Sequence, residues 1–76
     1  MGDTMKYIRF NLIEQKPKTA VYEVVSVTQG THLGMVSWYG PWRQYVFYPG
    51  PDTIWSDGCL VEVREFLQEL KEGRKP

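Results

Sequence analysis

The chain has 76 residues, nine basic and nine acidic side chains, and single cysteine and histidine residues. A domain of this size buries only about 60% of the surface that its unfolded chain exposes, so we expect support from self-association. One cysteine excludes an intrachain disulfide, and one cysteine with one histidine excludes a zinc site built from those ligands. The zero net charge disfavours a general nucleic-acid binder, which ordinarily carries a basic excess.

The distribution of apolar residues argues against a membrane protein. No apolar run approaches the roughly 18 residues that are needed to span a bilayer. The first residues also lack the apolar core of a signal peptide. We therefore expect a soluble, cytoplasmic protein with no membrane partner.

The first two thirds of the chain predict antiparallel strands. Residues 5–12 alternate apolar and polar side chains, which is the period of a half-buried strand. Residues 19–28 are apolar on both faces and predict a central strand or one that a partner chain covers. Residues 33–39 and 42–48 predict a hairpin that turns at residues 39–42 and ends at a proline. Residues 53–55 fit either a short fifth strand or an extended link.

The last third predicts one helix, capped by Ser56 or Asp57 and ended at Gly73. Its apolar stripe consists of Leu60, Val63, Phe66, Leu67 and Leu70. The acidic stripe expected on the opposite, solvated side consists of Glu62, Glu65, Glu69 and Glu72. We expect an α+β fold, a single two-layer domain over residues 1–76. It would contain a three- to four-stranded antiparallel meander with the C-terminal helix packed on one face.

The predicted hairpin concentrates aromatic and hydrogen-bonding side chains near its turn. Aromatic rings can stack on a nucleobase, for about 1–3 kcal/mol per base, and a guanidinium can hold phosphate through two hydrogen bonds. This favours a site for a flat, anionic, nucleotide-like molecule. The alternative is that the rings only pack across the hairpin, since aromatic residues stabilise strands. The candidate ligand-binding residues are Trp38, Tyr39, Trp42, Arg43, Gln44 and Tyr45.

Other reactive or charged residues give weaker predictions. Cys59, with His32 and Asp57, could form a nucleophilic set. Cys59 also falls beside the apolar stripe, however, and free cysteine is among the most buried residue types. We therefore predict no catalytic residue, no metal ligand and no cofactor. A basic group near the N-terminus is either an anion-attracting rim or, as we favour, solvated surface. It consists of Lys6, Arg9, Lys16 and Lys18.

Several short motifs follow one another along the second half of the chain. They are Leu33-Gly34, Trp38-Tyr39, Trp42-Arg43-Gln44-Tyr45, Phe47-Tyr48-Pro49 and Cys59-Leu60. This pattern resembles a family of short, mostly uncharacterised phage and bacterial proteins. The resemblance covers about half of the chain and extends to the opening segment Lys6-Tyr7-Ile8-Arg9-Phe10.

A phage setting suggests an analogy to small oligomeric anti-defence "sponge" proteins, which bind nucleotide-derived immune signals without cleaving them. The analogy implies a non-enzymatic homo-oligomer in the host cytoplasm, with ligand sites between subunits. One alternative is a protein–protein interaction module or an inhibitor of a host protein, because Trp, Tyr and Arg are also enriched in interface hot spots. A single-stranded nucleic-acid binder is a further, less favoured alternative.

Overall fold

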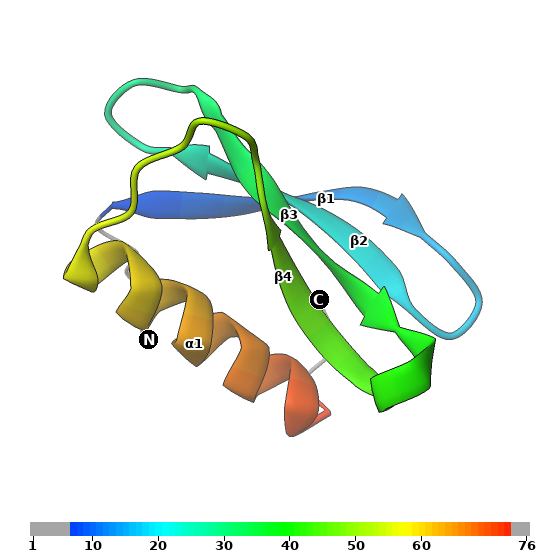
Figure 1. Cartoon of the computed structure of the whole chain (residues 1–76). Coiled ribbons are helices and arrows are strands. Elements are labelled where there is room, and N and C mark those ends of the chain that lie inside the picture. Colours follow the sequence, from blue (N-terminus) through cyan, green and yellow to red (C-terminus); the bar gives the residue numbers. More distant parts are fainter. Residues whose placement is uncertain (1–6, 74–76) are drawn as a thin grey trace.

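The computed structural model describes residues 7–73. Within this range, one sheet of four strands in the order β1-β2-β3-β4 carries one helix on one of its faces (Figure 1). Every neighbouring pair of strands is antiparallel. The expected two-layer α+β meander is therefore confirmed, with four strands. The elements are β1 (Ile8–Gln15), β2 (Ala20–Ser26), β3 (His32–Tyr39), a 3-10 turn (Gly40–Trp42), β4 (Gln44–Pro49) and α1 (Asp57–Lys71).

One strand prediction needs adjustment, and the structure decides between the two alternatives for residues 53–55. The described part of β1 reaches Gln15, because a bulge between Leu12 and Glu14 inserts Ile13 and interrupts the period of two. The predicted start of this strand at residues 5 and 6 lies outside the described residues. Residues 53–55 form a link and not a strand. In this link the hydroxyl of Thr53 donates to the carbonyl of Gly50 at 2.8 Å and accepts from the indole N–H of Trp55 at 2.9 Å.

The core lies between α1 and one face of the sheet, which we call the helix side. Cross-strand partners share a face, and the helix side includes the pairs Phe10–Val24, Tyr22–Val36 and Trp38–Tyr45. From α1, Phe66 stacks on Phe10 with ring centroids 4.0 Å apart and meets Tyr22 edge-on at 4.9 Å. These contacts fix which way the helix faces.

The opposite face of the sheet is the open side, since no helix of residues 7–73 lies over it (Figure 1). It carries Glu23, Met35 and Tyr48, which are paired across β2, β3 and β4. The prediction that the second strand is central is confirmed by its position between β1 and β3. A partner chain over the open side remains a prediction.

The start of α1 agrees with the prediction, but two of its side chains do not face the direction that we predicted. The hydroxyl of Ser56 caps α1 by accepting a hydrogen bond from the Cys59 N–H at 3.2 Å. Cys59 packs against the core, and the buried stripe continues from it through Val63 and Phe66. Leu60, which we expected in this stripe, is turned outward and is 51% exposed.

The prediction of a solvated Glu62 is wrong, because this residue is only 8% exposed. Its carboxylate accepts hydrogen bonds from the backbone N–H groups of Tyr7, at 3.2 Å, and Ile8, at 3.1 Å. Edge strands leave backbone donors without a ladder partner. Glu62 supplies the acceptor, which ties the beginning of β1 to α1. The other three glutamates of the predicted stripe are exposed, as expected.

Candidate functional site: a groove between β4 and α1

The turn between β3 and β4 determines where the candidate residues point. After the 3-10 turn, Arg43 adopts the left-handed conformation with φ of 55°. Its backbone N–H donates to the carbonyls of Tyr39, at 2.9 Å, and Gly40, at 3.0 Å. A residue with a Cβ is uncommon in this region, whereas glycine adopts it at no steric cost. This chain therefore has an arginine at a position where the backbone conformation favours glycine.

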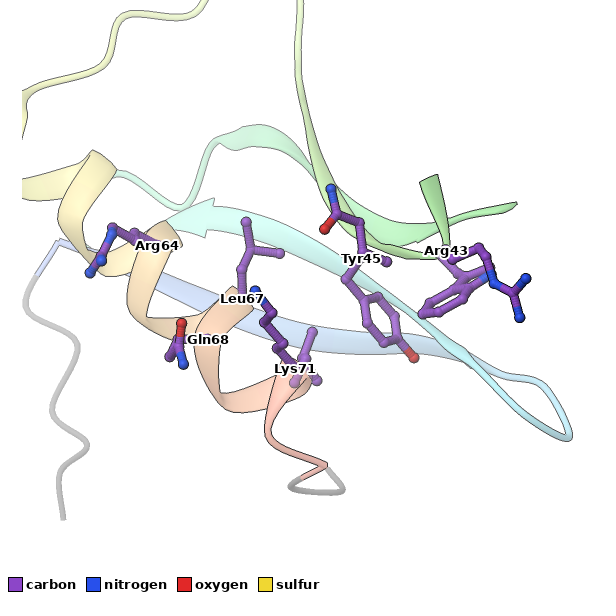
Figure 2. Close-up of a pocket in the computed structure, with 9 residues that line it drawn as sticks. Arg43, Tyr45, Arg64, Leu67, Gln68 and Lys71 are labelled. Carbon is purple, nitrogen blue, oxygen red and sulfur yellow. The ribbon is translucent and has the colours of Figure 1, made fainter. Parts of the chain in front are cut away.

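The six candidate residues divide between the two sides of the sheet. Tyr39 and Trp42 border a hollow that also includes Val46, Phe47 and Tyr48. The remaining four line a groove beside α1 of about 420 Å³, within the roughly 300–1,000 Å³ typical of small-molecule sites (Figure 2). We call it the β4–α1 groove. Its lining residues are Trp38, Arg43, Gln44, Tyr45, Arg64, Leu67, Gln68, Leu70 and Lys71. Of the four candidate residues among them, Gln44 is the cross-strand partner of Tyr39, so its position in the sheet belongs to the open side.

The aromatic wall of the groove combines one fixed ring with one accessible ring. Trp38 and Tyr45 are cross-strand partners whose rings meet edge-to-face, with centroids 5.4 Å apart. The phenol oxygen of Tyr45 accepts a hydrogen bond from the Ala20 N–H at 3.1 Å, which holds that ring in place. Trp38 remains 43% exposed. Its indole therefore offers a ring surface to a ligand.

The groove is positively charged. Of the described residues, its lining includes the cations Arg43, Arg64 and Lys71 and no carboxylate. None of these three side chains has a hydrogen bond or ion pair with another residue in the range 7–73. Cations clustered in a groove with low-dielectric walls raise the local concentration of anions. Gln68 is already engaged, because its amide donates to the Glu72 carboxylate at 3.1 Å.

The view of the groove shows how the charges are spread (Figure 2). Arg64 lies at one end and Arg43 at the other, with Leu67, Lys71 and Tyr45 between them. The two guanidinium groups point away from each other in this view. The positive charge therefore extends along the groove and is not concentrated at one point.

Sequence analysis did not identify the helical half of this groove. A signal was present, since Arg64, Gln68 and Lys71 follow the i, i+4, i+7 spacing of one helix side. The spacing alone does not place that side next to the hairpin, because this depends on how the helix crosses the sheet.

The hollow on the open side has a different character. Trp42 is 66% exposed and meets Tyr39 edge-to-face at 5.1 Å. The hollow measures about 310 Å³, and the described residues that line it are all uncharged. We call it the aromatic hollow.

The structure does not assemble the nucleophilic set. The Nδ1 atom of His32 lies 2.8 Å from a carboxylate oxygen of Glu23 on the open side, whereas half-buried Cys59 packs on the helix side. Among residues 7–73, no group of three or more histidine, cysteine or acidic residues is arranged to hold a metal ion. No helix in that range has the length and apolar character to cross a bilayer.

The described members of the basic group near the N-terminus do not line the groove. Arg9, Lys16 and Lys18 are exposed, and none of them lines the groove. Lys6 lies outside the described residues. The arrangement of the three described residues agrees with the favoured interpretation of solvated surface.

Comparison with known proteins gives one informative relative. No family model matches the chain, and no solved structure matches it. A protein described as an uncharacterised 9.3 kDa protein of Acholeplasma phage L2 is 31% identical over 58 residues, which cover 76% of this chain and 74% of that protein. This similarity supports the expectation of a phage-type protein. The chain therefore belongs to the same family as the small protein of Acholeplasma phage L2.

Proposed function

We propose that this phage-type protein binds a nucleotide-derived signalling molecule in the β4–α1 groove and sequesters it without converting it, as an anti-defence sponge. The observation that carries the proposal is the exposed indole of Trp38 in a groove with cations that lack partners among the described residues. A nucleobase stacks on Trp38, and a phosphate binds Arg43.

The backbone of Arg43 supports a functional role for its side chain. A non-glycine residue in a left-handed conformation costs of order 1–3 kcal/mol and persists where the surrounding structure imposes it, often at ligand sites. Asparagine or glycine would meet the same backbone requirement at lower cost. Neither can hold a phosphate as a guanidinium does.

The geometry favours one of the two indoles near the turn as the stacking platform. Trp38 shares the groove with the cations, whereas Trp42 borders the uncharged aromatic hollow. Because Trp38 stays 43% exposed in a single chain, one subunit does not enclose a ligand. We therefore propose homo-oligomers in which a second subunit closes the groove.

The test is calorimetric titration of the protein with a panel of mononucleotides and cyclic nucleotides. We expect binding that Arg43→Gly weakens by about 1.5–3 kcal/mol, the range for hydrogen bonds to charged groups. The same variant should keep or raise its unfolding free energy, because glycine relieves the left-handed backbone. Absence of binding to every nucleotide contradicts the proposal.

The matched control is Arg9→Ala, which removes an exposed arginine outside the groove. It should leave nucleotide affinity unchanged. Equal losses for the two variants would show that the protein attracts anions through its overall charge and not through the groove.

A second candidate function rests on the aromatic hollow. Exposed tryptophan and tyrosine side chains are typical anchors of protein interfaces, and Trp42 is 66% exposed. In this alternative the protein inhibits a host protein through the open side. A host protein that is captured stoichiometrically by the wild type and by Trp38→Ala, and is lost with Trp42→Ala, would favour this function.

A further inference from the structure

We infer that the ligand of the β4–α1 groove carries two phosphate groups separated by a nucleoside, as in a dinucleotide. This inference rests on the proposed function and specifies its ligand. It starts from the placement of the cations. Arg64 and Lys71 are seven positions apart on α1, which corresponds to about 10 Å along the helix axis. Arg43 belongs to the other wall of the groove.

One phosphate group cannot serve both ends of the groove. Charge-assisted hydrogen bonds require donor and acceptor atoms about 2.7–2.9 Å apart. Arg43 and Arg64 lie at opposite ends, and their guanidinium groups diverge (Figure 2). A ligand that uses both must therefore bring an anionic group to each end.

The middle of the groove suits the part of the ligand between its phosphates. Leu67 and Tyr45 provide apolar and aromatic surface there, with Lys71 beside them (Figure 2). A nucleoside triphosphate has more charge than a dinucleotide but carries its phosphates in one contiguous chain. It can occupy one end fully and leaves the other end without an anion. Lys71 in the middle can pair with either ligand, so the separation of the phosphates is the property by which the two end arginines distinguish the dinucleotide from the triphosphate.

The experiment compares four probes by calorimetric titration: adenosine monophosphate, adenosine triphosphate, a 5′-phosphorylated linear adenine dinucleotide and cyclic diadenosine monophosphate, with the guanine counterparts in parallel. We expect at least one dinucleotide to bind about tenfold more tightly than the monophosphate and the triphosphate, a difference of about 1.4 kcal/mol. Comparison of the affinities for the linear and the cyclic dinucleotide shows which of the two forms the groove prefers.

The decisive variant is Arg64→Gln, with Lys16→Gln as a matched removal of an exposed charge outside the groove. Arg64→Gln should lower dinucleotide affinity by much more than monophosphate affinity and so abolish the preference for the dinucleotide, while Lys16→Gln alters neither affinity. Both positions are exposed, and thermal unfolding verifies that the variants keep the fold.

The possible failures separate the two proposals. Triphosphate binding as tight as dinucleotide binding, or an equal loss of all nucleotides in Arg64→Gln, overturns this inference and leaves nucleotide binding in the groove intact. Absence of binding by all four probes and their guanine counterparts overturns the proposed function together with this inference.

Discussion

The two sides of the β3–β4 hairpin have different surfaces, although they come from the same short segment. The helix side presents Trp38 and Tyr45 next to cations, and the open side presents Tyr39 and Trp42 without any charged residue in the described lining. Strand alternation sends neighbouring side chains to opposite faces. Residues that cluster in the sequence are therefore not necessarily one site in the fold.

The helix makes the difference between the two sides. It adds Arg64 and Lys71 to one side of the hairpin and nothing to the other. In our proposal the helix side binds the anionic ligand and a second subunit closes the groove there, while the open side is the surface of the alternative interaction with a host protein. The experiments below alter one side at a time.

The largest expected effect is on stability. Phe66→Ala removes the ring that stacks on Phe10 at 4.0 Å and should cost about 3–5 kcal/mol of unfolding free energy. Tyr48→Ala on the open side should cost below about 1 kcal/mol in a single chain, because this residue is exposed. Urea unfolding measures both values. A comparable cost for Tyr48→Ala would mean that another chain covers the open side.

The next effect concerns ligand affinity and compares the two indoles. Trp38→Ala should weaken nucleotide binding by about 1–3 kcal/mol, the contribution of one stacked base. Trp42→Ala should leave the affinity unchanged, since Trp42 lines the aromatic hollow and not the groove. Calorimetric titration with the nucleotide panel measures both. The opposite pattern would move the site to the open side.

The smallest effect concerns a buried hydroxyl on the helix side. Tyr22 is 2% exposed, and its hydroxyl has no hydrogen-bond partner among the described residues. Tyr22→Phe removes this unsatisfied group and should raise the unfolding free energy by about 1 kcal/mol. Tyr48→Phe, at an exposed position, should change nothing. Chemical denaturation at neutral pH measures both, and a loss of stability in Tyr22→Phe contradicts the expectation.

The pH dependence gives an independent check on the same residue. Burial, and secondarily Tyr45, raises the pKa of Tyr22 above its ordinary value of 10.0. The unfolded chain therefore releases this proton at a lower pH than the folded one, and stability falls as the pH rises above about 10. In Tyr22→Phe this part of the decline should disappear.

The architecture could be predicted because alternation and helical spacing are local properties of the sequence. The exceptions lie at β1, an edge strand of the sheet, and where α1 packs against it. Ile13 forms a bulge, which hides the continuation of β1, and Glu62 is buried because the edge strand needs an acceptor for its N–H groups. Neither the bulge nor the burial of Glu62 changes the spacing of apolar residues in a way that the sequence reveals.

The site could be predicted only in part. The aromatic segment indicated the side chains of the hairpin, four of which line the groove. Strand alternation divides Trp38 from Tyr39. The left-handed conformation at position 43 could not be predicted, because the sequence shows an arginine there and not the glycine that marks such a turn. Whether the cations of α1 reach the groove depends on how the helix packs on the sheet. The spacing of residues in the sequence does not show this packing.

The most direct test follows the three indole N–H signals of the chain by nuclear magnetic resonance during titration with the mononucleotides, the cyclic nucleotides and the linear and cyclic dinucleotides named above. Trp38 lines the groove and Trp42 the aromatic hollow, while the Trp55 indole donates to Thr53. We predict that the Trp38 signal shifts and saturates while the signals of Trp42 and Trp55 stay in place. A shift of Trp42 without Trp38, or no shift of any indole signal, would contradict a nucleotide site between β4 and α1.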